Sequence, residues 1–186
     1  AVRPDKTYIA DGRVRAASLV VDPAGNIVAR YDKIHLFDVE VSDTTKVYRE
    51  SASFEPGDHL AVAKTPFATI GLSVCYDLRF PGHYLDLTKL GATVIAVPSA
   101  FTLPTGAAHF EALMRARAIE NATFVIAACQ SGDHDSGRQT YGHSMVVSPW
   151  GEVIDHLGNE PGLLTVDLDF TELETIRRQI PAWRLQ

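Results

Sequence analysis

A short strand that ends on a cysteine constrains this chain more than any other feature of its sequence. Residues 69–74 alternate apolar and small side chains, and Cys75 follows where a polar turn precedes an expected helix. Gly71 and Ser73 share a face with Cys75, which we expect to leave open space around the sulfur. Open α/β sheets place reactive groups at the carboxyl ends of their strands, so Cys75 is a candidate nucleophile. Free cysteine is also among the most buried residue types, and plain packing is the alternative.

The rest of the chain mixes strand and helix patterns. A hairpin is expected over residues 16–31, around a turn at 23–26, and an irregular polar loop is expected over residues 34–66. Further strands are expected at 92–97, 123–129, 144–147, 152–155 and 163–167, a polar loop at 130–139, and helices at 82–90, 107–121 and 171–178. Hairpins combined with strand–helix–strand units predict an α/β fold with a mixed sheet, in a single domain over residues 1–186.

Composition and charge exclude several classes of function. The 186 residues are 46% hydrophobic and 22% charged, which is ordinary for a globular domain, and the formal net charge of −6 argues against non-specific nucleic-acid binding. No apolar run approaches the roughly 18 residues that span a bilayer. Cys75 and Cys129 make neither a disulfide framework nor a metal-ligand spacing, so a redox or metal protein is disfavoured and a reducing, cytoplasmic setting is expected.

In addition to Cys75, two charged residues stand out in the sequence. Lys33 closes the second strand of the hairpin and is followed by Ile34, Leu36 and Phe37, an apolar setting in which an ammonium group needs a partner. Glu50 lies in the long loop, and alone it would be read as a surface carboxylate.

Together these windows resemble a known family. Residues 33–40, Glu50 with Ser51, and residues 71–81 are similar to the nitrilase superfamily of carbon-nitrogen hydrolases, as are residues 98–101, 105–110, 115–121 and 141–147. The similarity runs from about Ser18 to Pro181. Residues 127–132 and 138–144 resemble the branch of amidases that act on deaminated glutathione, and the omega-amidases share much of the rest.

The resemblance implies a fold and a mechanism. The fold would be an α-β-β-α sandwich with mixed sheets, and Cys75 would attack an amide carbonyl to form a thioester that water hydrolyses. Lys33 would favour the thiolate of Cys75 and, with the backbone N–H of Tyr76, stabilise the oxyanion. Glu50 matches the glutamate that orients the lysine. The mechanism implies neither an organic cofactor nor a metal.

One family residue has no counterpart in the sequence. The family's general base is a second glutamate that lies ahead of the hairpin, with the first strands of the sandwich, and Glu40, Glu55 and Glu111 stand in other motif contexts. We therefore expect a fold that is incomplete at its N-terminus, and a chain that is inactive by itself. A truncated chain and a non-catalytic homologue that acts as a binding or scaffold module both remain open.

Four cationic residues are candidates for substrate binding. His109, expected at the start of a helix after a Gly106 turn, could face an anionic group or simply hold its loop. Arg79 could pair with a substrate carboxylate or, more commonly, with Asp77. Arg138 and His143 flank the loop that resembles the deaminated-glutathione branch, where a substrate with two carboxylates would be favoured. The expected partners are a small-molecule amide and further copies of the chain, as a homodimer or larger homo-oligomer with residues 80–90 buried between subunits, and no nucleic acid or membrane.

Overall fold

The structure, a computed structural model, describes residues 11–43, 45–135 and 137–184, so the expected domain over residues 1–186 extends at both ends beyond the described part. The strands are β1 (Ala17–Val21), β2 (Ile27–Asp32), β3 (Asp38–Glu40), β4 (Val47–Arg49), β5 (Val62–Lys64), β6 (Thr69–Leu72), β7 (Val94–Ala96), β8 (Phe124–Ala127), β9 (Ser131–Asp133), β10 (Gln139–Tyr141), β11 (Met145–Val147) and β12 (Val153–His156). The helices are α1 (Pro81–Lys89), α2 (Leu103–Asn121) and α3 (Phe170–Gln179), with short 3₁₀ turns η1 (Glu50–Ala52), η2 (Cys75–Arg79) and η3 (Ala182–Arg184).

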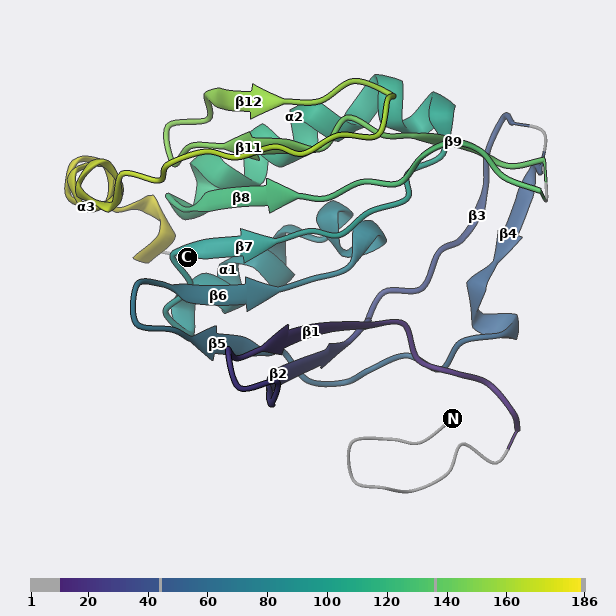
Figure 1. Cartoon of the computed structure of the whole chain (residues 1–186), viewed down its shortest axis with the longest axis horizontal. Helices are drawn as coiled ribbons and strands as arrows, with labels where there is room; N and C mark the ends of the chain where they lie inside the picture. The colour runs from purple at the N-terminus through teal and green to yellow at the C-terminus, as the bar shows by residue number, and fades with distance from the viewer. Residues whose placement is uncertain (1–10, 44, 136, 185–186) are drawn as a thin grey trace.

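A six-stranded mixed sheet organises the molecule, in the order β12-β11-β8-β7-β6-β5. The central strands β6, β7 and β8 are parallel, and β5, β11 and β12 pair antiparallel to their neighbours. The other strands of the described residues form two-stranded pairs, β1 with β2, β3 with β4 and β9 with β10 (Figure 1). The α/β class with a mixed sheet is confirmed.

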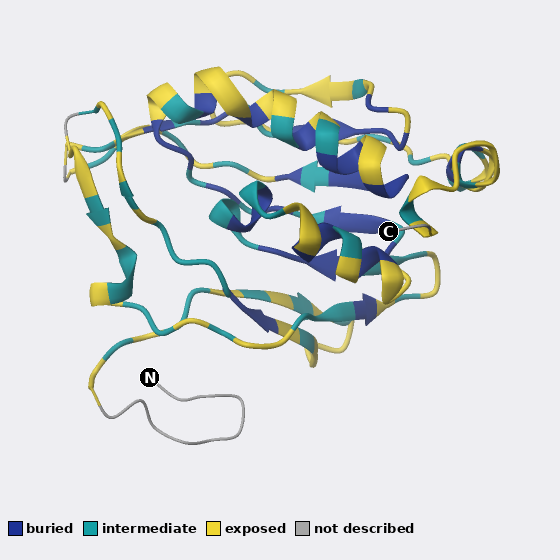
Figure 2. Cartoon of the chain, turned by 180° about the vertical axis from the view of Figure 1, so that it is seen from behind, coloured by how far each residue is buried: buried dark blue, intermediate teal, exposed yellow. Residues whose placement is uncertain are grey.

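Helices α1 and α2 cover one face of this sheet (Figure 2). Each connects one parallel strand to the next in the same direction across the sheet, so right-handed crossovers place both helices on the same side. Their apolar faces and the strands form the main core, in which Tyr84, Leu87, Phe110, Met114 and Ile95 are essentially inaccessible to solvent.

The small residues of β6 serve this packing. A Cβ atom added to Gly71 would lie 3.2 Å from Leu87 and 3.3 Å from Ile95, and the Ser73 hydroxyl is 3.0 Å from that of Tyr84. The expected open space on this face is therefore filled by α1, because the small side chains allow the helix to approach the sheet closely.

Helix α3 lies at the amino-terminal end of the parallel strands, away from the loops that follow them (Figure 1). Its Leu173 packs with Val94 and Phe124 in a second, smaller cluster. Asp169 caps the N-terminus of α3, because its carboxylate accepts the backbone N–H of Thr171 at 2.8 Å. Across the described ranges, every helix is too short or too polar to traverse a bilayer.

Several expected boundaries were wrong. Residues 163–167 form no strand, and Leu163 is 89% exposed. Helix α2 begins at Leu103 instead of residue 107, so Gly106 lies inside the helix, where an added Cβ would come within 2.3 Å of Tyr141. The segments expected to be irregular contain β3, β4 and β5 in residues 34–66, and β9 and β10 near residues 130–139.

Candidate functional site

Cys75 lies at the carboxyl edge of the sheet, as its position after a strand predicts. It follows β6 as the first residue of η2, and its backbone φ of 50° is unusual for a residue other than glycine. Its N–H donates to the carbonyl of Pro98 at 2.9 Å, which extends the pairing of β6 and β7 into the turn. Backbone strain of this kind recurs at functional sites.

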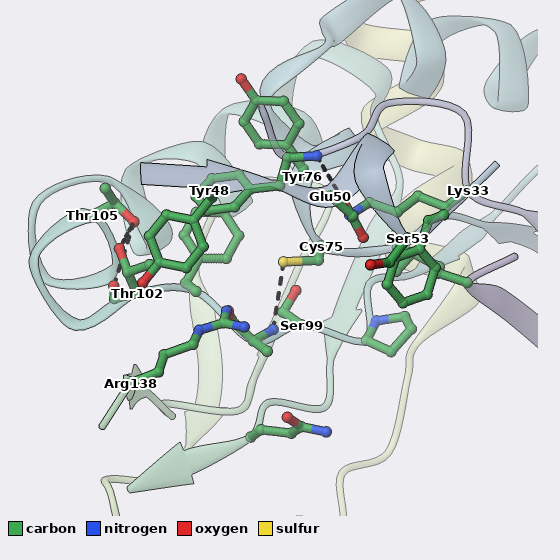
Figure 3. Close-up of a pocket in the computed structure, with 18 of the residues that line it drawn as sticks. Lys33, Tyr48, Glu50, Ser53, Cys75, Tyr76, Ser99, Thr102, Thr105 and Arg138 are labelled. Carbon is green, nitrogen blue, oxygen red and sulfur yellow. Dashed lines mark hydrogen bonds and ion pairs between the residues drawn. The ribbon is translucent and has the colours of Figure 1, made fainter. Parts of the chain in front are cut away.

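The sulfur faces a cavity of about 640 Å³ that is built from the segments after β6, β7 and β8 and from the loop that carries β3 and β4. Lys33, Glu50, Cys75, Tyr76 and Arg138 all line it. In Figure 3, Cys75 lies between Arg138 on one side and Lys33 with Glu50 on the other. The expected grouping of Cys75, Lys33, Glu50 and Tyr76 around one space is therefore observed.

Lys33 and Glu50 form a buried ion pair. Lys33 Nζ is 2.6 Å from Glu50 Oε2, and the lysine is only 4% exposed. The same carboxylate oxygen accepts the backbone N–H of Phe37 at 2.5 Å. A paired carboxylate removes much of the cost of burying an ammonium group, and it also fixes where that group points.

Opposing effects act on the pKa of the Cys75 thiol. Burial raises its pKa above the ordinary value, while the Ala100 N–H, Lys33 and Arg138 act in the opposite direction. The N–H of Ala100 lies 3.5 Å from Cys75 Sγ. Lys33 therefore favours the thiolate, as expected, but burial dominates. A thiol with a raised pKa needs a base to take its proton before the sulfur can act as a nucleophile.

The carboxylate that the cavity offers within the described ranges is Glu50, which is already engaged by Lys33. The other acidic candidates lie elsewhere: Glu55 pairs with Arg15 at 2.7 Å, and Glu111 contacts Arg115 on the exposed face of α2. This agrees with the expectation that these glutamates stand in other contexts.

The four expected substrate-binding residues separate into different environments. Arg138 lines the cavity, with its guanidinium bonded to the Ala100 carbonyl and 5.5 Å from the Tyr48 ring, and its buried Nε has no hydrogen-bond partner. His143 lies outside the cavity lining, with its ring stacked on Tyr141 at 3.8 Å and its Nδ1 2.6 Å from the Tyr141 carbonyl oxygen.

Arg79 and His109 lie together on the outer side of the turn. The guanidinium of Arg79 is 3.4 Å from Nδ1 of His109 and 5.3 Å from the Phe101 ring, and neither Arg79 nor His109 is among the cavity-lining residues. The expected pairing of Arg79 with Asp77 is wrong, because Asp77 is fully buried and bonds to His35 and Tyr31. His109 is in the second turn of α2 and not at its start, because the helix begins at Leu103, four residues before the expected residue 107.

Part of the cavity wall was missed from the sequence. Phe37 packs against Tyr48 and Tyr76, each with a ring-centroid separation of 5.0 Å, and Thr102 and Thr105 add hydroxyls that bond to each other at 2.8 Å. Phe37 and Tyr48 belong to the segment expected to be an irregular loop, and no local pattern signals that they meet.

Comparison with known proteins gives a consistent result. The family model described as carbon-nitrogen hydrolase matches residues 3–178. A deaminated glutathione amidase of Yersinia enterocolitica is 49% identical over 168 residues, covering 90% of this chain and 59% of the relative, and one of Dictyostelium discoideum is 46% identical, covering 89% and 57%. The chain thus spans less than two thirds of the length of these relatives.

Solved structures agree. The crystal structure of the C. elegans NitFhit protein has a TM-score of 0.83 at 38% identity, covering all of this chain and 44% of that one. An amidase from Nesterenkonia sp. AN1, described as showing Michael addition of acrylamide at its active site cysteine, has a TM-score of 0.71 at 31% identity, covering 89% and 61%.

Proposed function

Because the chain belongs to the carbon-nitrogen hydrolase family, we propose that it contributes the nucleophile of an amidase that cleaves a non-peptide carbon–nitrogen bond. One observation carries this proposal above the others. A cysteine on a turn with positive φ opens into the same cavity as a buried lysine–glutamate pair. Nucleophile, cation and orienting carboxylate are three of the parts that acyl transfer through a thioester requires.

The proposed reaction has two stages. Cys75 Sγ bonds to the amide carbonyl carbon, the carbon–nitrogen bond breaks, and the amine leaves with a proton to give a thioester. Water then attacks the thioester, which releases the carboxylic acid and restores the thiol. In both stages the carbonyl oxygen carries negative charge in a tetrahedral intermediate, and we assign the stabilisation of this charge to the Lys33 ammonium and the Tyr76 N–H. The position of both residues in the cavity lining and the hydrogen bond from Lys33 to Glu50 support this assignment.

The thiol proton needs an acceptor, because burial raises the pKa of Cys75. By resemblance to the nitrilase superfamily, that role belongs to a second glutamate. No glutamate in residues 1–186 stands in the matching motif context. Glu50 is not reassigned to it, since its Oε2 already accepts from Lys33 and Phe37. The comparisons lend no support to the expectation that this chain is inactive by itself.

For the substrate we propose an ω-amide that carries carboxylate groups, of the deaminated glutathione type. The relatives bearing that name support this choice, and so does Arg138 on the cavity wall. A substrate carboxylate in the cavity would form a charge-assisted hydrogen bond with its guanidinium. Small amides and further copies of the chain are the proposed partners, with residues 80–90 as the proposed contact between copies.

The test is hydrolysis of deaminated glutathione by the intact protein, followed as release of the amine product. Cys75→Ala should abolish turnover, and the matched control Cys129→Ala should retain it, because Cys129 does not line the cavity. Arg138→Met should raise KM for the carboxylate-bearing amide more than for a neutral amide. Turnover that persists in Cys75→Ala would exclude this cysteine as nucleophile. Binding of the amide by the parent without any turnover would favour the non-catalytic alternative.

A further inference from the structure

Lys33 and Cys75 lie in segments far apart in the sequence, and a third residue connects them. Asp77, two residues after Cys75, has no solvent-accessible surface. Its Oδ2 accepts the hydroxyl of Tyr31 at 2.7 Å and the backbone N–H of Val74 at 2.8 Å. Its Oδ1 accepts the backbone N–H of His35 at 3.2 Å and contacts His35 Nδ1 at 2.7 Å. Each carboxylate oxygen thus has two partners.

These partners flank both residues of interest. Tyr31 and His35 lie two positions before and two positions after Lys33, and Val74 immediately precedes Cys75. The Tyr31 hydroxyl also accepts the N–H of Ile34 at 3.0 Å, which adds a second link to the lysine segment. The carboxylate therefore joins the segment that carries the ammonium to the turn that carries the thiol.

We infer that Asp77 is a positioning residue that holds Lys33 and Cys75 in alignment for amide hydrolysis, an inference that rests on the function proposed above. It does not touch the cavity, and it acts through the two backbone segments it connects. Charge-assisted hydrogen bonds inside a protein are stronger than neutral ones, so a fully buried carboxylate with four of them makes a rigid connection.

Asparagine cannot replace this carboxylate. Each oxygen accepts one backbone N–H, from Val74 on one side and from His35 on the other. Either orientation of an asparagine amide would turn its NH₂ group toward one of these two backbone donors. One segment must then move away, and the stored strain at Cys75 would help to relax the turn.

A metal site is the competing use of this cluster, because ligand atoms of His35, Asp77 and His83 lie within 4.8 Å of one another. All four hydrogen bonds to Asp77 argue against it, since a cation would have to displace donors that fix the turn. His83 Nε2 lies 3.3 Å from the Leu72 carbonyl oxygen, which supplies that ring nitrogen with a partner.

The test measures the reactivity of the Cys75 thiol, independently of amide turnover. Cys75 in the intact protein is alkylated with iodoacetamide across a range of pH, with Cys129 counted separately by peptide mass spectrometry. In Asp77→Asn we expect the alkylation profile to move to higher pH, because Lys33 is no longer held beside the sulfur. If Asp77→Asn only removed a negative charge and neither segment moved, the alkylation profile would shift to lower pH. The direction of the shift therefore distinguishes a positioning role of Asp77 from a purely electrostatic one.

Kinetics supply the second readout. Asp77→Asn should lower kcat by about 100-fold while KM changes by less than about threefold, the pattern of a displacement near 1 Å within the catalytic group. Tyr31→Phe removes one donor, keeps the ring and should give a smaller shift of the same sign, which keeps the test decisive should Asp77→Asn fail to fold. Asp155→Asn, exposed on the edge strand β12 and outside the cavity lining, is the matched control and should resemble the parent.

An alkylation profile that is unchanged or moves to lower pH in both variants would overturn the inference. So would an equal upward shift in Leu173→Ala, a core variant far from the turn, because general destabilisation would then explain the effect. A parent protein that hydrolyses no amide would refute the proposed function and leave the alkylation profiles to decide the role of Asp77.

Discussion

Gly57 allows the closest backbone approach behind Lys33, and replacing it with alanine gives a sharp test of the site geometry. The N–H of Gly57 donates to the Lys33 carbonyl at 2.8 Å. A Cβ atom added to Gly57 would lie 2.1 Å from the carbonyl oxygen of Asp32 and 2.9 Å from its Cβ. Relief to an ordinary contact of 3.4 Å requires the two backbones to separate by about 1.3 Å.

Asp32 has little freedom to move. It is 7% exposed, and its carboxylate contacts Arg15 at 2.9 Å and Arg30 at 2.8 Å. Much of the displacement should therefore pass to the neighbouring Lys33. A misplacement near 1 Å in a catalytic group costs about 100-fold in rate, and overpacking costs about 1–3 kcal/mol of stability.

The assay compares kcat/KM for amide hydrolysis and the free energy of unfolding in urea for Gly57→Ala and Gly158→Ala. Gly158 is exposed in the loop after β12, where an added Cβ meets nothing within 4 Å, so its variant should match the parent in both measurements. Gly57→Ala with hydrolysis within about threefold of the parent would refute the argument that this contact fixes Lys33.

Three further predictions concern stability. Leu173→Ala should lower the free energy of unfolding by about 2–5 kcal/mol in urea titrations, because it empties the small core under α3, whereas Leu163→Ala, 89% exposed, should change it little. Burial raises the pKa of Cys129 from 9.0 to about 12. The contribution of this thiol to the free energy of unfolding is therefore fully present below pH 9 and is lost as the pH rises toward 12. Cys129→Ala should therefore show a shallower alkaline decline, and an equal decline would contradict this. Asp169→Ala should lower the melting temperature at pH 7, because the hydrogen bonds from Thr171 lower the pKa of the Asp169 carboxyl and stabilise its charged form. The difference in melting temperature between parent and variant should shrink as acid protonates this carboxyl, which calorimetry at pH 7 and pH 3 checks.

Local pattern predicted the elements that depend on local chemistry. The hairpin with its turn at residues 23–26, the strand before Cys75 and the helix after it follow from alternation, turn residues and the spacing of apolar residues. The apolar strands β7 and β8 were found because continuous burial leaves a continuous apolar run.

What the sequence did not predict depends on contacts between distant segments. Residues 163–167 alternate like a strand but pair with no neighbour, and Gly106 marks a close approach of Tyr141 and not a turn. Lys33 and Glu50 were placed in one site by resemblance alone, since the apolar residues after Lys33 indicate a partner without identifying it, and Glu50 carries no local signal. Asp77 was given the wrong partner because its nearest cation in sequence, Arg79, points outward, while its true partners are 42 and 46 positions away.

Burial of the Cys75 sulfur, which raises the pKa of the thiol, also bears on chemical damage. Hydrogen peroxide reacts with thiolates far faster than with thiols, and the ladder from sulfenic to sulfonic acid begins with that reaction. Because burial raises the pKa of Cys75, it favours the thiol, the form that peroxide attacks slowly. Activation only when a substrate and a base meet at the sulfur would then protect the protein between turnovers.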